Sequence, residues 1–191
     1  MKLKELLRDY EPWDIQEQKD KEEILLCLET YADLYTRNNA CVHITVSPWI
    51  VNADNSKVLM VHHNIYRSWG WCGGHADGDT DLLHVALREA YEETGIQNLQ
   101  PYGSDILSVD ILPVKEHMRK GKLVKAHKHI NITFLCIGDE QQSLRACPKE
   151  NSGVLWIAKE DIDTCVTEEA MRPLYRKLIE KSDRILRRSS R

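Results

Sequence analysis

The sequence lacks several features that would place it in a class at once. No stretch approaches the ~20 uninterrupted apolar residues of a membrane helix, so we expect no transmembrane span and no membrane partner. A basic excess is also missing, because the net charge is −4 and the isoelectric point is near 6.1. That balance argues against a nucleic-acid duplex as partner. The exception is a basic C-terminal tail over residues 187–191, which we expect to be frayed.

Paired cysteines are absent as well. The six cysteines include no C-x-x-C pair, and the start of the chain, Met1 to Arg8, lacks the apolar run of a secretory leader. We therefore expect reduced thiols and a cytoplasmic location. Cys72 lies beside a glycine-rich loop, but the sequence indicates no base to activate it, so we do not assign it as a nucleophile.

The chain length of 191 residues, 42% of them hydrophobic, suits one well-buried domain with helical additions. Residues 1–38 are interpreted as a helical extension packed on the core. Leu3 to Arg8 predicts a short helix, and Glu22 to Tyr35 places apolar residues near i, i+3, i+4 spacing. A dimer contact or a substrate lid is the open alternative for these helices. The main domain would then cover residues 39–186.

From Cys41 onward the pattern favours strands. Cys41 to Ser47 alternates, a turn is predicted over Asn52 to Ser56, and Lys57 to His63 completes a hairpin. Three further strands are predicted over Ile106 to Val114, Ile130 to Ile137 and Gly153 to Ala158. Strands interrupted by helices predict an α/β sandwich.

Two connecting segments are also interpreted. Lys115 to Lys125 is polar and contains Gly121, so an exposed loop is expected. Glu168 to Leu186 predicts a closing helix, with Thr167 as its N-cap and Pro173 kinking or restarting it.

The segment Asp81 to Thr94 predicts the helix that carries the chemistry. At ~100° per residue, Glu89, Glu92 and Glu93 fall within an arc of about 100° and can reach one point. Gly95 is expected to end the helix in the left-handed conformation. The face expected to pack on the sheet comprises Leu83, Ala86, Leu87, Ala90, Tyr91 and Thr94.

Three converging carboxylates repel one another, and they lie in the half of the helix where the macrodipole is already negative. A divalent cation would relieve this repulsion, and oxygen ligands favour Mg²⁺ or Mn²⁺ over zinc. The alternative is a solvated acidic helix face. The upstream pair Gly73-Gly74 favours a site, because glycine lets the backbone approach a ligand or expose a carbonyl to a metal.

The segment from Gly74 to Ile96 resembles the Nudix box, whose family pattern is G-x5-E-x7-R-E-U-x-E-E-x-G-U with U a bulky aliphatic residue. Two positions depart from it. Thr80 stands where the family has glutamate, with Asp79 and Asp81 beside it, and Ala90 replaces a larger aliphatic residue. The positions that match at the required spacing are Gly74, Arg88, Glu89, Glu92, Glu93, Gly95 and Ile96.

The resemblance implies a Nudix-type α/β/α sandwich with a mixed β-sheet, here with extra N-terminal helices. It implies hydrolysis of a diphosphate bond in a nucleoside diphosphate linked to another moiety, a small-molecule substrate. Mg²⁺ or Mn²⁺ would be held by Glu89, Glu92, Glu93 and the Gly73 carbonyl, with Arg88 orienting the glutamates. The family often draws a further base from outside the box, for which the candidates are Glu116, Asp139 and Glu140.

Residues outside the box are candidates for substrate binding. Arg67 and Trp69 flank the glycine loop, where arginine binds phosphate and tryptophan stacks on a base. His127 and His129 share one face of a strand. Contact with substrate phosphate is one interpretation of this pair, a second metal site is another, and ordinary strand-face histidines are the third.

Two functions from different classes remain open. One is a metal-dependent hydrolase, which the matched glutamates favour. The other is a catalytically silent Nudix fold that binds or senses a nucleotide. An isomerase of the isopentenyl-diphosphate type shares the fold but needs a cysteine in a motif that this chain lacks. A homodimer is an open alternative to a single chain.

Overall fold

Two long strands form the centre of the sheet. The structure is a computed structural model that describes residues 3–119 and 122–189. Strand β1 (Val42–Asn52) runs parallel to β8 (His127–Gly138), and their register pairs His43 with His129 and Asn52 with Gly138. Both strands are longer than the sequence predicts, because this pairing continues past the segments of regular alternation.

The remaining strands make the sheet mixed, since they pair antiparallel with their neighbours. The order is β3-β2-β1-β8-β5, with β4 paired to β1 and β9 paired to β2. The predicted hairpin is confirmed as β1 and β2. The bounds are Lys57–His63 for β2, Trp69–Gly70 for β3, Gly74–His75 for β4, Gln100–Val114 for β5 and Asn151–Ala158 for β9.

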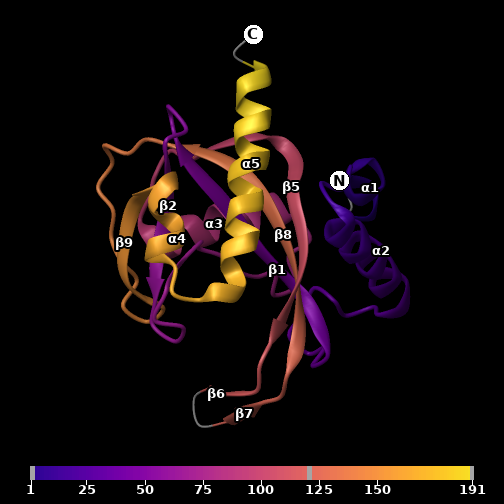
Figure 1. The fold of residues 1–191 in the computed structure, drawn as a ribbon. Helices are drawn as coiled ribbons and strands as arrows, with labels where there is room; N and C mark the ends of the chain where they lie inside the picture. The colour runs from indigo at the N-terminus through magenta and orange to yellow at the C-terminus, as the bar shows by residue number, and fades with distance from the viewer. Residues whose placement is uncertain (1–2, 120–121, 190–191) are drawn as a thin grey trace.

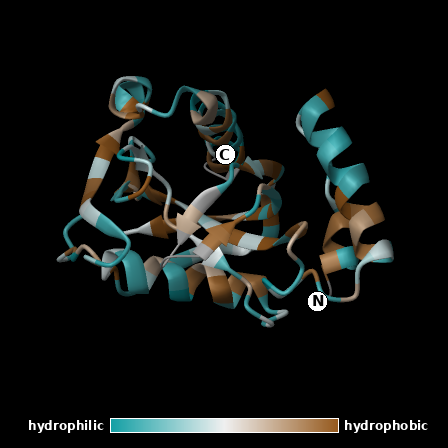
Figure 2. Cartoon of the chain, turned by 90° about the horizontal axis from the view of Figure 1, so that it is seen from below, coloured by the Kyte–Doolittle hydropathy of each residue, from teal (hydrophilic) through white to brown (hydrophobic). Residues whose placement is uncertain are grey.

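Helices cover both faces of this sheet (Figure 1). α3 (Leu82–Thr94) packs on β1 and β8, and α5 (Arg172–Ser189) packs on the other face, where Tyr175 stacks on Trp49 at 5.9 Å between ring centroids. Apolar residues of these elements form the buried clusters between the layers, and the hydrophobic stretches of each element can be followed in Figure 2. The expected α/β/α sandwich with a mixed sheet is confirmed. Among the described residues, no helix is long and apolar enough to cross a membrane.

The N-terminal helices differ from the predicted ranges. α1 (Leu3–Asp9) agrees, but α2 covers Ile15–Thr30 and not Glu22 to Tyr35. Asp14 starts α2 early because its carboxylate accepts a hydrogen bond from the Glu17 backbone N–H at 2.8 Å. Both helices lie beside β5 (Figure 1) and contribute Leu3, Leu7 and Ile24 to the main core.

Two predictions in the second half of the chain are corrected. The expected loop over Lys115 to Lys125 contains a short antiparallel hairpin, β6 (His117–Arg119) with β7 (Lys122–Val124), because its alternating residues can pair. Gly121 lies outside the described residues. The tail expected from residue 187 continues α5 as far as Ser189, where Arg187 pairs with Asp183 on the preceding turn at 3.3 Å; residues 190–191 are outside the described part.

The closing helix also begins later than predicted. Short helices η1 (Lys159–Asp161), α4 (Ile162–Cys165) and η2 (Glu169–Met171) precede it, and α5 starts at Arg172. Thr167 does not cap it, because α5 starts five residues later and the Thr167 hydroxyl donates to the Arg67 carbonyl oxygen at 3.3 Å. Pro173 lies in the first turn of α5, directly after η2, so the predicted restart of the helix at this proline is confirmed; its missing N–H leaves no intrahelical bond unmade there.

A buried charge network joins α2 to α5. The Glu17 carboxylate is fully buried and accepts hydrogen bonds from the ammonium groups of Lys177 at 3.0 Å and Lys181 at 2.9 Å. Ser108 of β5 donates to it as well, at 2.9 Å. Burial raises the pKa of Glu17, but the two lysines outweigh burial and lower that pKa from 4.5 to about 2.

We expect Glu17→Gln to lower the free energy of unfolding by about 3–5 kcal/mol near pH 7, because it leaves the buried Lys181 ammonium without its carboxylate partner, whereas Lys177 keeps Asp110. The exposed Glu22→Gln on the same helix is the control and should change it by less than about 0.5 kcal/mol. Urea denaturation measures both. Because the folded pKa of Glu17 lies below the unfolded value, the difference between wild type and Glu17→Gln should persist above pH 4.5 and shrink between pH 4.5 and 2. A constant difference across that range would contradict the assignment.

Candidate active site

Helix α3 begins and ends with side-chain and backbone caps. Asp81 accepts a hydrogen bond from the His84 backbone N–H at 3.1 Å, and Asp79 accepts one from the Asp81 N–H at 2.9 Å. These aspartates therefore stabilise the segment in which Thr80 replaces the glutamate of the motif. At the other end Gly95 has φ of 70°, the left-handed conformation predicted for it.

The buried face of α3 is rotated from the predicted one. Tyr91 was expected on the packed face but is 50% exposed, whereas Glu93 is only 4% exposed. Leu82 and Val85 are buried in addition to Ala86 and Ala90. Glu93 is drawn inward because its carboxylate accepts a hydrogen bond from the Gly73 backbone N–H at 3.1 Å. One glutamate of the three is thus part of the helix–sheet interface.

The glycine loop and the three glutamates lie against each other. A Cβ atom at Gly74 would overlap the Glu89 carboxylate, and one at Gly73 would overlap the backbone of β1. Glycine is therefore required here by close approach. Arg88 donates to Glu89 at 3.0 Å, and its Nε lies 3.9 Å from a Glu92 oxygen. The structure thus brings Gly73, Arg88 and all three glutamates together.

The electrostatics of this cluster favour a cation. Burial raises the pKa of Glu93 to about 8, and the nearby carboxylates of Glu150, Glu89 and Glu92 add to that rise. Burial also raises the pKa of Glu89, although Arg88 opposes the shift. The available ligand atoms are carboxylate oxygens beside the Gly73-Gly74 loop, where a side chain on either glycine would not fit. Hard oxygen ligands of this kind suit Mg²⁺ or Mn²⁺, so the residues present fit these ions.

The chain matches the sequence profile of the NUDIX domain over residues 42–181, which is most of its length. The chain belongs to the Nudix family. A search of curated protein sequences found no significant match.

Solved Nudix structures share the fold at low sequence identity. The MutT protein from Methanosarcina mazei Go1 has a TM-score of 0.54 and 23% identity over 75% of this chain and 94% of its own. The dihydroneopterin triphosphate pyrophosphohydrolase of E. coli has a TM-score of 0.53 and 15% identity over 71% and 94%. A NUDIX-family hydrolase from Clostridium perfringens has a TM-score of 0.51 and 21% identity over 72% and 96%.

Two of the three base candidates, Asp139 and Glu140, have partners of their own outside the glutamate cluster. Glu140 pairs with Lys57 at 2.7 Å, and Asp139 caps Gln141, both next to the end of β1 at Asn52. Strand β4, which contains Gly74, pairs with β1 at Val46, and Val46 lies six residues or roughly 20 Å before Asn52 along β1. Glu116 lies two residues after the C-terminal end of β5 at Val114.

A carboxylate that the sequence did not single out lies closer to the Nudix helix. Glu150 immediately precedes β9, and its charge raises the pKa of both Glu93 and Glu89. The neighbouring Asn151 side chain donates to the Glu93 carbonyl at 2.9 Å, which ties this segment to α3. Glu150 is exposed to solvent. No motif marks it, because its proximity depends on how β9 joins the sheet.

The predicted substrate residues fall in two groups. Trp69 lies on β3, paired to β2 and near His62, and the preceding Arg67 has a positive φ of 50° and accepts a hydrogen bond from Thr167. His127 and His129 lie on β8, with β2 and β1 between them and β3. The Arg67–Trp69 group and the two histidines therefore lie at strands that are not neighbours in the sheet.

Cys72 precedes the glycine loop but is only 1% exposed. Burial, followed by the charge of Glu93, raises the pKa of its thiol well above the usual range. Because a thiolate is the reactive form, this environment opposes a nucleophilic role and agrees with the sequence interpretation.

We expect Glu93→Gln to raise the free energy of unfolding of metal-free protein at pH 8 by about 1–3 kcal/mol, because a neutral amide replaces a carboxyl group whose ionisation is opposed by burial. The matched control Glu92→Gln changes a side chain that is 58% exposed and should have little effect. Thermal denaturation in EDTA measures both. Addition of Mn²⁺ should stabilise wild type but not Glu93→Gln. Equal stabilisation of both by Mn²⁺ would contradict the role of Glu93 as a ligand.

Proposed function

We propose that the protein is a divalent-metal-dependent hydrolase that cleaves a diphosphate bond in a nucleoside diphosphate linked to another moiety. The observation that carries this proposal is the buried Glu93 carboxylate, which is hydrogen-bonded to the Gly73 loop and surrounded by Glu89, Glu92 and Glu150. Family membership supports the reaction class, and the pyrophosphohydrolase activity in the name of the E. coli relative is of the same kind.

Each residue of the cluster has a separate role in this proposal. Glu89, Glu92, Glu93 and the Gly73 carbonyl hold Mg²⁺ or Mn²⁺. When bound, the metal neutralises phosphate charge and lowers the pKa of a coordinated water. Arg88 contacts both Glu89 and Glu92, so it orients two ligands and reduces their mutual repulsion. Preset orientation matters because the carboxylates can then hold the metal without first rearranging.

Glu150 is our choice for the base outside the box. It is exposed, so it can exchange protons with solvent, and it lies near the buried glutamates. A carboxylate in that position can take a proton from the attacking water. Arg67, Trp69, His127 and His129 remain candidates for binding the substrate, with arginine and histidine suited to phosphate and tryptophan to a base.

We expect turnover of at least one member of a panel of ADP-ribose, NADH, dinucleoside polyphosphates, CoA and nucleoside triphosphates, with Mg²⁺ or Mn²⁺ required. Product analysis should identify cleavage between two phosphorus atoms. Glu93→Gln should lower kcat/KM by at least about 10³-fold, and the surface variant Glu22→Gln should not change it. If no substrate turns over while a nucleotide raises the melting temperature, the protein is a binding module and the proposal is wrong.

We further expect Glu150→Gln to lower kcat by about 10²–10⁴-fold while Mn²⁺ still stabilises the protein, because proton removal is lost but the metal ligands remain. Glu140→Gln, at the other end of β1, is the matched control. Similar losses in both variants, or an unchanged kcat in Glu150→Gln, would exclude Glu150 as the base.

A further inference from the structure

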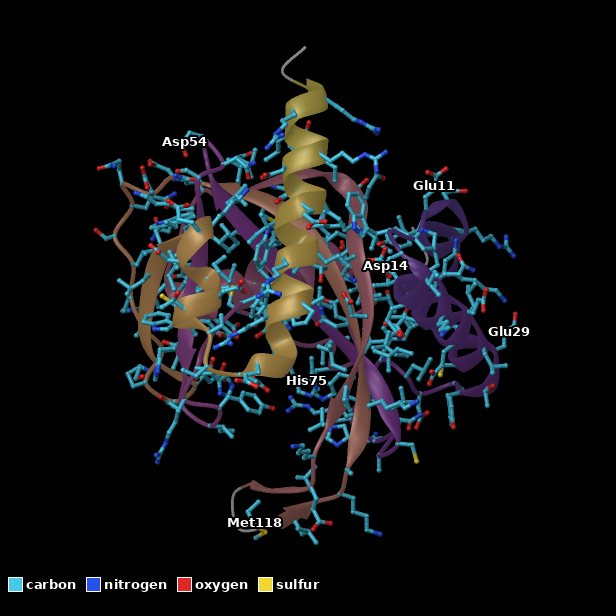
Figure 3. All side chains as sticks on the ribbon, in the orientation of Figure 1. Glu11, Asp14, Glu29, Asp54, His75 and Met118 are labelled. Atoms are coloured by element: carbon cyan, nitrogen blue, oxygen red, sulfur yellow. The ribbon has the colours of Figure 1, made fainter. Side chains whose placement is uncertain are left out.

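Histidines from three strands meet where β1 and β8 begin. The parallel register pairs His43 with His129, and the antiparallel register of β4 places His75 opposite Thr45. His127 lies two residues before His129 on the same face of β8. Figure 3 shows His75 at the end of the sheet from which the β6–β7 hairpin with Met118 projects, opposite the Asp54 turn.

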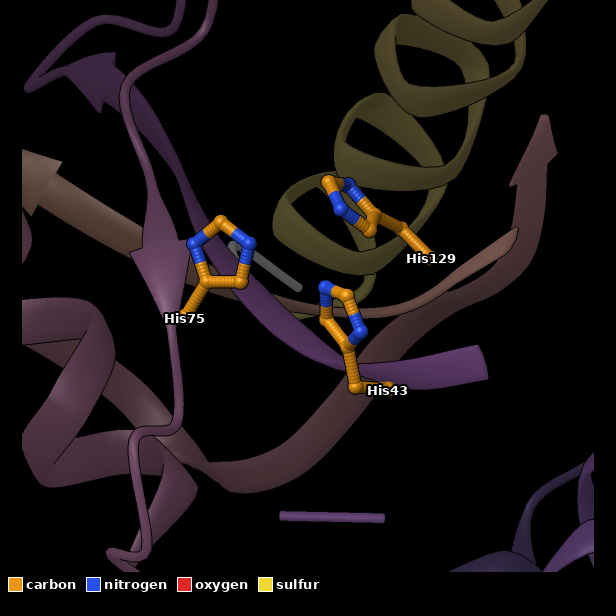
Figure 4. Close-up of side chains that lie close together, drawn as sticks. All are labelled: His43, His75 and His129. Atoms are coloured by element: carbon orange, nitrogen blue, oxygen red, sulfur yellow. The ribbon is translucent and has the colours of Figure 1, made fainter. Parts of the chain in front are cut away.

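The three rings of His43, His75 and His129 face a common point (Figure 4). One ring nitrogen from each lies within 4.8 Å of the other two. The ring centroids form a nearly equilateral triangle with sides of 5.1, 4.9 and 5.0 Å. Three imidazoles bound to one tetrahedral ion at about 2.05 Å would have centroids roughly 5 Å apart, so the spacing of the rings matches coordination. Rotation of the rings would have to bring the ligand nitrogens from within 4.8 Å of one another to the roughly 3.3 Å that one ion requires.

His43 is fixed in the tautomer that a metal ligand needs. Its Nδ1 lies 2.9 Å from the Asn39 carbonyl oxygen, which can only accept, so Nδ1 carries the proton. The lone pair is therefore on Nε2. His43 is 5% exposed, and within residues 3–119 and 122–189 no hydrogen-bond partner contacts Nε2. A buried acceptor of this kind is costly unless something occupies it.

A hydrogen-bond relay orients His129 in the same way. His127 Nδ1 lies 2.8 Å from the Lys125 carbonyl oxygen, so it donates to that oxygen and leaves the lone pair on His127 Nε2. His129 Nε2 lies 3.1 Å from that atom and donates to it, which places the His129 lone pair on Nδ1. Donation of the distal ring N–H to a fixed acceptor is the usual support of a metal-binding histidine.

The histidine cluster neighbours the glutamate site, because His75 directly follows Gly74, against which Glu89 lies, but its ligand atoms are chemically different and come from the strands. His43 shares a face of β1 with Trp49, which stacks on α5, whereas the glutamates project from α3 on the other face. Apart from His127, the side-chain charges that act on His43 are those of Arg37 and Asp77, which form an ion pair with each other.

We propose that His43, His75 and His129 form a transition-metal site, selective for Zn²⁺ over Mg²⁺, with His127 supporting His129. Imidazole nitrogens suit zinc and cobalt, whereas Mg²⁺ requires oxygen ligands. Three protein ligands leave a fourth position for water or a phosphate oxygen.

The test measures Zn²⁺ binding to the full chain after removal of metals, by isothermal titration in excess Mg²⁺ so that the glutamate site is occupied. We expect one Zn²⁺ per chain with Kd below about 1 µM. His75→Asn and His129→Asn should weaken binding by more than about 100-fold, and His127→Asn by about 10–100-fold. The matched control His84→Asn changes an exposed histidine on α3 and should leave Kd unchanged.

Cobalt absorption of the wild-type protein gives an answer that does not depend on how the variants fold. Co²⁺ in a four-coordinate nitrogen site should give intense visible bands that Zn²⁺ abolishes, whereas oxygen sites give weak six-coordinate bands. Intense bands that persist in Glu93→Gln would support the proposal. Absence of Zn²⁺ binding in wild type, or its loss in Glu93→Gln but not in His75→Asn, would overturn it and leave stacked histidines as the explanation.

Discussion

The parallel pairing of β1 with β8 is the constraint on which the rest of the structure depends. β1 is buried along its whole length and pairs with β8 on one side. On its other side it pairs with β4 near its start and with β2 near its end. Because β4 and β2 pair with different parts of β1, β4 with its Gly74 is held against Val46, where α3 can cover it. The position of the carboxylates relative to the loop follows from that placement.

Burial gives this arrangement its chemical character. Glu93 lies in the interface between α3 and the sheet, so its carboxylate is short of water and beside other carboxylates. The backbone N–H of Gly73 donates a hydrogen bond to only one of the two carboxylate oxygens of Glu93. A well-packed apolar residue at position 93 would make the metal-free helix interface more stable. The cost of keeping a carboxylate there is consistent with a site whose stability depends on a bound cation.

Sequence reasoning succeeds where the determinants are local. The glutamate spacing, the Gly95 cap and the β1–β2 hairpin each depend on residues close together in the chain, and the structure has the cap and the hairpin as predicted. Sequence reasoning misses the contacts that depend on pairing between strands far apart in the chain. Glu150 approaches α3 only through β9, and His43 meets His129 only because β1 and β8 are parallel. The start of α2 at Ile15 was missed because a single capping aspartate outweighs the apolar spacing further on.

The buried carboxylate of Glu17 makes the N-terminal helices part of the domain that carries the Nudix fold. The family profile covers residues 42–181, yet that segment contains both lysines whose charge Glu17 compensates from outside it. Leu3, Leu7 and Ile24 of the same outside segment fill part of the main core. The unit of folding in this chain is therefore larger than the unit of sequence similarity. Transplanting the shared segment alone would separate the buried Lys181 from its carboxylate, whereas Lys177 would keep Asp110, which lies inside that segment.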